Sequence, residues 1–290
     1  MEGRATSLRA LGYLLGLMLL GMFVGNLLSA LVFLQAGLDP SQLLGSEGGG
    51  MPRLTRDALR MSTLLTHLCT FSIPALGLAH AWYREGWQEA TGLLKPRNWA
   101  GLLYGVGFVA IGFPLAQYLY WWNLQFPLPP ALAEMERSAG EVVKAFIVMD
   151  GPMELVLNLL IVGFVAAFGE ELVFRAWVQP RLHARLRNGH VAVWATAFLF
   201  SAIHFQFAGF LPRMLLGGLL GYLYLWGRNL WIPIAAHFFF NSAQLVAQYF
   251  FAEKMDQIDP EKIDQPHWLV GVLPLLLLVW AGREIKKRVY

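Results

Sequence analysis

The segment Met153–Val178 reads MELVLNLLIVGFVAAFGEELVFRAWV, and it decides how the rest of the chain can fold. Nearly all of its residues are apolar, yet its second half contains the adjacent carboxylates Glu170 and Glu171 and the guanidinium of Arg175. Placing an ionisable side chain at membrane depth costs at least about 2.5–3.5 kcal/mol of free energy. Three of them within two helical turns therefore indicate a functional or structural role. We therefore predict that this segment crosses a membrane and that its polar residues belong to a buried site.

The composition of the whole chain is that of a membrane protein. Of its 290 residues, 57% are hydrophobic and 14% are charged, whereas soluble domains carry about 25% charged residues. Apolar runs near 20 residues predict membrane-spanning helices, because backbone groups in lipid must pair within their own segment. We predict an all-α, polytopic helical bundle that forms one integral-membrane domain over residues 1–290, with a motif-bearing core at about 152–251.

Charge and cysteine content exclude several classes of function. The net charge of +3 is small, and the basic residues lie in short loops and at the C-terminus, which is typical of orientation signals rather than of a nucleic-acid surface. Cys69 is the single cysteine, so neither an internal disulfide nor a cysteine-based zinc knuckle is available. We predict the lipid bilayer, and no nucleic acid, as a partner.

Eight apolar segments predict eight membrane spans with both termini on the cytoplasmic side. Lys and Arg residues at the two termini, in the 84–97 and 181–187 loops and at Arg228 fall on one side, which the positive-inside rule makes cytoplasmic. The first segment is long for a signal peptide, so we expect an uncleaved anchor. The predicted spans cover about residues 8–36, 58–82, 99–122, 152–180, 191–207, 213–226, 231–251 and 268–281.

Two connections are unusual. Apolar and charged residues alternate loosely over 132–146, which predicts a short helix at the membrane interface. The fifth and sixth spans are short and Arg213 lies at their hairpin, so we expect this hairpin to end below the far surface. In the sixth span, Gly217, Gly218 and Gly221 predict a smooth face that another helix approaches closely.

Helical spacing separates the roles of the two carboxylates. Residues three or four apart share a helix face, so we predict that Glu171 pairs with Arg175. Glu170 is rotated about 100° from Glu171, so the two cannot point in the same direction. We expect the Glu171–Arg175 pair to set the local electrostatics, while Glu170 faces a cavity and accepts a proton.

Two later spans each add a histidine, His204 and His237, and Asn241 lies one turn after His237. Counted from the cytoplasmic ends of their predicted spans, Glu170 and His237 lie roughly 15 Å and 9 Å deep, at about 1.5 Å per residue. By the same count His204 lies roughly 20 Å deep, so only a tilted or late-starting fifth helix brings it level with the others.

A carboxylate, two imidazoles and an amide in a wet cavity favour hydrolysis without a cofactor. The carboxylate acts as a base toward water, an imidazole orients that water, and His and Asn donors stabilise an oxyanion. Zinc is the alternative, with Glu170, His204 and His237 as ligands and water in an open position. Against zinc, the chain has no His-Glu-x-x-His motif and no two histidines spaced i, i+4.

Three motifs together resemble those of the CPBP family, the CAAX-processing and bacteriocin-processing intramembrane proteases. They are Glu-Glu-x-x-x-Arg at 170–175, Phe-x-x-x-His at 200–204 and His-x-x-x-Asn at 237–241, within a similarity over about Leu155–Ala247. The family includes the Ras-converting CAAX endopeptidase type and the bacterial Abi proteins.

This resemblance implies an eight-helix intramembrane glutamate endopeptidase in a bacterial-type cell membrane. Its substrate would be a peptide or protein with a membrane anchor, CAAX-type prenylated chains included. Glu170 would activate water together with His204, and His237 with Asn241 would form the oxyanion site. Glu171 and Arg175 would be structural or substrate-positioning neighbours.

Each of these residues alone has a structural explanation. Glu171–Arg175 is readily an internal ion pair, and membrane histidines are more often interhelical hydrogen-bond partners than catalysts. We expect His67 and His80, which have no partner motif, to be structural. Two other functions fit the same residues: a non-catalytic peptide-binding or immunity protein, and a proton-coupled transporter, although the chain shows no inverted repeats.

Overall fold

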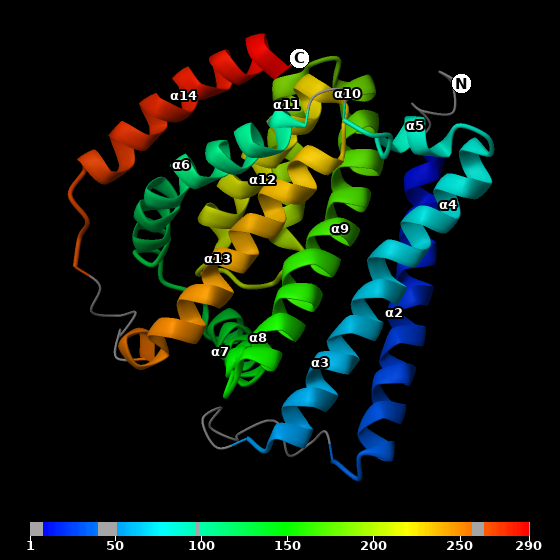
Figure 1. The fold of residues 1–290 in the computed structure, drawn as a ribbon, viewed down its shortest axis with the longest axis vertical. Coiled ribbons are helices and arrows are strands. Elements are labelled where there is room, and N and C mark those ends of the chain that lie inside the picture. Colours follow the sequence, from blue (N-terminus) through cyan, green and yellow to red (C-terminus); the bar gives the residue numbers. More distant parts are fainter. Residues whose placement is uncertain (1–7, 40–50, 97–98, 257–263, 290) are drawn as a thin grey trace.

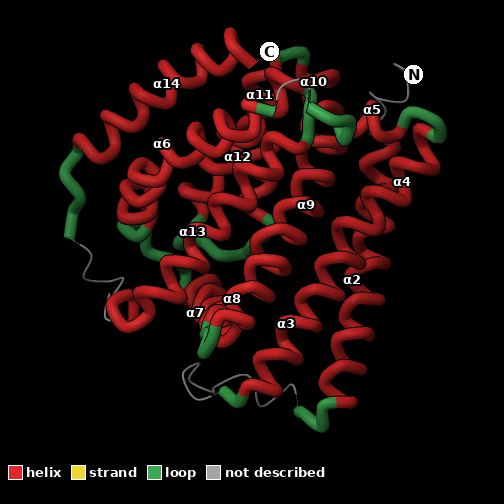
Figure 2. The backbone as a smooth tube through the Cα atoms, viewed as in Figure 1, coloured by secondary structure: helices red, strands yellow, loops and turns green. Residues whose placement is uncertain are grey.

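The computed structural model describes residues 8–39, 51–96, 99–256 and 264–289. Within these ranges every regular element is a helix, and no strand is present (Figures 1 and 2). The prediction of an all-α fold is therefore confirmed. The N-terminal end of α2 and the C-terminal end of α14 lie at the same end of the molecule (Figure 1), which we call the cytoplasmic end in accordance with the predicted topology.

Eight long helical units in the described residues correspond to the eight predicted spans. Four of them, over Arg9–Gln35, Arg53–Tyr83, Ala100–Asn123 and Pro152–Leu186, are long and apolar enough to cross a membrane. The units are α2 (Arg9–Gln35), α3–η3–α4 (Arg53–His67, Leu68–Ser72, Ile73–Tyr83), α6 (Ala100–Asn123), α8–η4–α9–η5–α10 (Pro152–Asn158, Leu159–Val165, Ala166–Glu171, Leu172–Val178, Gln179–Leu186), α11 (Gly189–Ala202), α12 (Phe210–Gly227), α13 (Trp231–Asp256) and α14 (Leu269–Val289).

Two further helices complete the fold. α5 (Trp87–Thr91) lies in the connection between α4 and α6. α7 (Pro130–Ile147) is the amphipathic helix expected over 132–146, and Pro130 begins it because the first turn needs no amide donor. The segments labelled η are π-helical, with backbone hydrogen bonds that skip one residue more than in an α-helix.

The fourth span is longer than predicted, and one of the basic residues expected in the loop after it lies within the helix. We expected it to end at Pro180, but the helix continues to Leu186. Pro180 is accommodated because it follows directly on η5, where the helical ladder is already shifted, and falls in the first turn of α10. The next residue, Arg181, is therefore not a loop cation. It is buried, and its guanidinium donates to the hydroxyl of Tyr83 and lies 4.3 Å from the ring centroid of Trp177.

The hairpin between α11 and α12 ends inside the bundle. With 14 residues, α11 is roughly 21 Å long, shorter than the ~30 Å hydrocarbon core. The loop after it is held from two sides. The Glu136 carboxylate of α7 accepts the amide of Phe207, and the Asn123 side chain at the end of α6 donates to the Phe207 carbonyl at 2.8 Å.

Close helix contacts depend on glycine at two places on α2. A Cβ added to Gly21 would lie 1.8 Å from the carbonyl oxygen of Cys69, and one at Gly25 would lie 2.8 Å from the Cα of Thr66. Because neither contact is possible for a larger residue, these glycines let α2 pack directly on α3 and η3.

A buried ion network joins α3 to α8 at the end of the bundle away from the termini. Arg56 and Arg60, one turn apart on α3, donate to the Glu154 carboxylate at 3.1 and 2.9 Å. Arg60 also donates to Asn158 at 2.9 Å, and all four side chains are buried. The sequence analysis treats Glu154 and Asn158 as part of an apolar run, so it misses this network.

Replacing Glu154 by alanine should destabilise the protein by about 1–3 kcal/mol, because two buried guanidiniums lose their shared carboxylate and keep Asp150 and Asp57 as partners. Thermal unfolding of the purified protein in detergent measures the effect. The matched control is Glu134→Ala on α7, which removes the exposed partner of Arg137 and should leave the melting temperature nearly unchanged. Equal losses for the two variants would contradict this role of the network.

Candidate active site

Glu171 and Arg175 form the centre of the polar site. The Arg175 guanidinium donates to the Glu171 carboxylate at 2.9 Å, and neither side chain is exposed. Arg175 also donates to the Gly217 carbonyl of α12 at 2.9 Å, and Glu171 lies 2.9 Å from Nδ1 of His237 on α13. The predicted Glu171–Arg175 pair is therefore confirmed, and it ties three helical units together.

Glu170 has different partners from Glu171, as its position on the helix predicts. Its Oε1 lies 3.5 Å from Nε2 of His67, and its Oε2 lies 3.8 Å from Nε2 of His237. The two adjacent carboxylates thus approach opposite edges of the same imidazole of His237. The Glu170 side chain is 12% exposed, whereas that of Glu171 is fully enclosed.

His204 lies two residues after the last residue of α11 and is held by the backbone of that helix. Its Nδ1 donates to the carbonyl of Phe200 at 2.8 Å, since a carbonyl oxygen can only accept. The Phe200 ring lies between two imidazoles, with centroid distances of 5.1 Å to His204 and 5.7 Å to His237. Phe205 has a φ of 51°, unusual for an aromatic residue, which turns the chain directly after His204.

The observed helix ends change the residue counts by which the depths of Glu170 and His204 were compared. Glu170 lies 16 residues before Leu186, and His204 lies 15 residues after Gly189, where the next helix begins. At ~1.5 Å per residue both are roughly 23 Å from the same end. The expected difference between Glu170 and His204 rests on a fourth span that ends at Pro180, whereas the helix continues to Leu186. The same count still places His237, six residues after Trp231, closer to its own helix end. His204 is also close enough to Glu170 to interact with it electrostatically.

Asn241 lies one turn after His237 on α13, as predicted. Its side-chain amide donates to the carbonyl of Val162 in η4 at 2.9 Å. That contact uses one of the two amide hydrogens and leaves the second available. The structure thus links all four predicted catalytic residues to one region, formed by α9, the end of α11 and the first half of α13.

His67 is the residue of this region that the sequence analysis assigns to a structural role. It is the last residue of α3, and its ring stacks on Phe71 with centroids 4.6 Å apart. It reaches Glu170 because residue 169 is glycine: a Cβ there would lie 2.9 Å from Cε1 of His67 and 2.7 Å from Oγ of Ser72. A histidine inside an apolar span was the available signal, because ionisable residues at membrane depth are rarely placed there without a role.

The three π-helical segments adjoin these residues. η3 begins directly after His67, while η4 and η5 enclose α9, whose last two residues are Glu170 and Glu171. An extra residue in a helical turn rotates the following side chains relative to those before it, and such insertions are frequent at functional sites. The backbone irregularities therefore coincide with the polar residues.

The ring hydrogen bonds decide which nitrogen of each histidine remains available. His204 donates from Nδ1 to a carbonyl, and Nδ1 of His237 faces the Glu171 carboxylate. Both rings thus present Nε2 for chemistry. Metal-bound histidines are often held in this way. Among the described ranges, no group of three or more His, Cys, Asp or Glu side chains is arranged to hold a metal ion.

The fold and this site define the class of the protein: an integral membrane protein whose bundle encloses a polar site of carboxylates, imidazoles and an amide. Residues 152–243 match the sequence model of the family described as type II CAAX prenyl endopeptidase, Rce1-like. This match confirms the predicted family resemblance and covers the six motif residues, Glu170, Glu171, Arg175, His204, His237 and Asn241.

One relative and the solved structures complete the comparison. The chain is 27% identical over 179 residues to the uncharacterised protein YpbD of Bacillus subtilis, an alignment that covers 60% of this chain and 82% of YpbD. No solved structure matches the chain.

Substitution of Glu171 should lower the stability of the protein more than substitution of Glu170. Glu171→Ala leaves Arg175 buried without its ion-pair partner and should cost about 3–5 kcal/mol. Glu170→Gln keeps the side-chain volume and removes no such partner, so its effect should stay within about 1 kcal/mol. Thermal unfolding in detergent compares the two variants, and a Glu170→Gln protein that is as unstable as Glu171→Ala would contradict this division.

Proposed function

We propose that this protein is an intramembrane endopeptidase that hydrolyses a peptide bond in a membrane-anchored substrate, with Glu170 as the general base. The observation that carries the proposal is the Glu170 carboxylate between Nε2 of His67 and Nε2 of His237, at 3.5 and 3.8 Å, inside a membrane bundle. The match of residues 152–243 to the CAAX prenyl endopeptidase family supports it.

In the proposed reaction, Glu170 removes a proton from a water molecule, and the resulting hydroxide attacks the carbonyl carbon of the scissile bond. His204 orients that water through Nε2, the nitrogen that its Nδ1 hydrogen bond leaves available. When the tetrahedral intermediate collapses, the C–N bond breaks and Glu170 gives its proton to the leaving nitrogen. No cofactor takes part in this sequence.

The oxyanion of that intermediate needs donors close to Glu170. Asn241 has a second amide hydrogen beyond the one bonded to Val162, and His237 lies one turn before it. To donate from Nε2, His237 must carry both ring protons, and the Glu171 carboxylate at its Nδ1 is placed to balance that charge. Fixed donors aimed at a developing negative charge are usually the largest contribution to such catalysis.

The substrate class follows from the location of the site and from the family. A site enclosed by membrane helices is accessible to peptides that a lipid or helical anchor holds at the bilayer. Since the matching family is named for CAAX prenyl endopeptidase activity, a prenylated C-terminal peptide is the first substrate to test. Peptides with other anchors are the second choice.

A zinc-dependent protease is the second candidate, because the Nδ1 contacts of His204 and His237 are of the kind that also hold metal ligands. Here Glu170, His204 and His237 would be ligands, and zinc would supply an activated water. Elemental analysis of the active protein and an assay with a chelator distinguish the mechanisms. Stoichiometric zinc, with activity lost to chelation and restored by zinc, would establish the second.

Glu170→Gln should lower the rate of cleavage of a prenylated reporter peptide by at least about 10²-fold, since the amide cannot accept a proton from water. The assay uses purified protein in lipid, and an unchanged melting temperature controls for folding. Glu134→Gln on α7 makes the same substitution at an exposed carboxylate outside the motifs and should retain activity. Full cleavage by the Glu170→Gln protein would refute the proposal, and a cellular phenotype that survives this change would favour a binding protein.

We assign His67 a positioning role, in which it holds Oε1 of Glu170. His67→Ala should therefore lower kcat by about 10-fold, with KM little changed, because this role positions the base and does not bind the substrate. His67→Gln should restore much of the rate, because its amide can donate to the same oxygen. A purely structural role predicts instead that rate and melting temperature fall together in both variants.

A further inference from the structure

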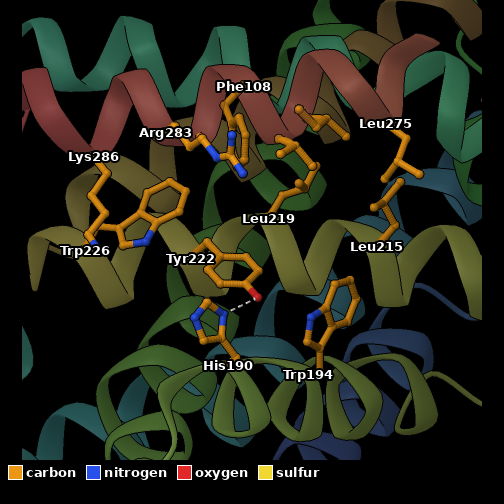
Figure 3. Close-up of a pocket in the computed structure, with 13 residues that line it drawn as sticks. Phe108, His190, Trp194, Leu215, Leu219, Tyr222, Trp226, Leu275, Arg283 and Lys286 are labelled. Atoms are coloured by element: carbon orange, nitrogen blue, oxygen red, sulfur yellow. Dashed lines mark hydrogen bonds between the residues drawn. The ribbon is translucent and has the colours of Figure 1, made fainter. Parts of the chain in front are cut away.

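A groove lies between α6, α11, α12 and α14, apart from the candidate active site (Figure 3). Its volume is about 440 Å³, within the range of small-molecule pockets. None of the six motif residues lines it. Its walls are almost entirely apolar and aromatic, with Phe108 on α6, Trp194 on α11 and Leu219 on α12 among them.

The groove changes character along its length. On α14 its lining residues share one face, from Leu275 through Val279 to Arg283 and Lys286. On α12 the lining runs over the same number of residues, from Leu215 to Trp226. Figure 3 shows Leu275 beside Leu215 at one end and Lys286 beside Trp226 at the other. One end is therefore apolar, and the other is cationic.

The length of the groove matches one leaflet of a bilayer. Eleven residues separate Leu275 from Lys286, which is roughly 16 Å of helix, or about half of the ~30 Å hydrocarbon core. The cationic end coincides with the C-terminal end of α14, on the side predicted to be cytoplasmic. Trp and Tyr side chains gather at this level in membrane proteins, and Tyr222, bonded to His190 at 2.8 Å, lies there.

The two cations at this end of the groove are Arg283 and Lys286. Within the described ranges no carboxylate pairs with Arg283 or Lys286, and both residues are exposed. The next residue, Lys287, provides the contrast, since its ammonium pairs with Glu284 at 3.0 Å. An apolar groove that ends in two unpaired cations complements an amphiphile with an anionic head.

We propose that this groove binds one anionic phospholipid of the cytoplasmic leaflet, with an acyl chain along α12 and α14 and its phosphate at Arg283 and Lys286. The bilayer itself supplies this ligand. The groove shares no lining residue with the candidate active site, so lipid binding does not depend on the proposed proteolysis. A Glu170→Gln protein should bind the lipid as tightly as the wild type.

The test measures dissociation constants of the full-length protein in detergent for phosphatidylglycerol and phosphatidylcholine with identical acyl chains. Wild type should bind phosphatidylglycerol at least about tenfold more tightly, since each cation near a headgroup contributes about fivefold. The Arg283→Gln, Lys286→Gln double variant should lose this preference. The control Lys287→Gln, on the same helix turn but paired with Glu284, should keep it.

A second variant tests the apolar part. Val279→Trp fills the groove from a half-exposed position, so it should weaken binding of both lipids while the melting temperature is unchanged. Equal affinity of wild type for the two lipids, a preference that survives the double variant, or undiminished binding to Val279→Trp would each overturn the proposal. Stoichiometric displacement of phosphatidylglycerol by a farnesylated peptide would also overturn it, because the groove would then belong to a substrate.

Discussion

The guanidinium of Arg175 has no contact with solvent, and this constraint shapes the centre of the protein. A buried charge is tolerated when it is paired with an opposite charge and hydrogen-bonded. Glu171 supplies the opposite charge and Gly217 a carbonyl, while His237 binds the same carboxylate from another helix. Because each contact comes from a different helical unit, satisfying one cation fixes how α9, α12 and α13 lie relative to each other.

The position of Glu170 follows from that arrangement. Its neighbour in sequence is held by Arg175 and His237, so the backbone of α9 cannot rotate to take Glu170 away from the imidazoles. Gly169 allows α3 to approach and brings His67 to the carboxylate. The π-helical segments on both sides of α9 rotate the residues before and after it, so these side chains pack against other neighbours than those of α9. A rigid ion pair thus orients a less enclosed carboxylate beside it, which is the arrangement that a general base requires.

Local rules were sufficient to predict part of this site from the sequence. The Glu171–Arg175 pair follows from i, i+4 spacing on one helix, and the spans follow from hydropathy. The contact of His67 with Glu170 could not be predicted in this way, because it joins residues 103 positions apart and depends on how two helices cross. The same is true of Arg56 and Arg60 with Glu154, whose lone carboxylate and Asn158 were hidden in an apolar run.

Mistakes about where a helix ends affected the predicted positions of residues more than mistakes about whether a helix is present. Taking Pro180 as a terminus made the residue count from Glu170 to its helix end too short, because the proline follows a π-helical segment and the helix continues to Leu186. The same error placed Arg181 in a loop, whereas it is buried against Tyr83 and Trp177. The rule that a proline ends a helix failed here, because the π-helical turn before Pro180 had already shifted the backbone hydrogen bonds.

The most direct test of the account is an experimental structure of the Glu170→Gln protein in lipid with an uncleaved prenylated peptide. The account predicts that the scissile carbonyl lies beside residue 170, with its carbon about 3–3.5 Å from an ordered water and its oxygen facing His237 and Asn241. A peptide bound elsewhere, or a side chain at position 170 turned toward lipid, would contradict it.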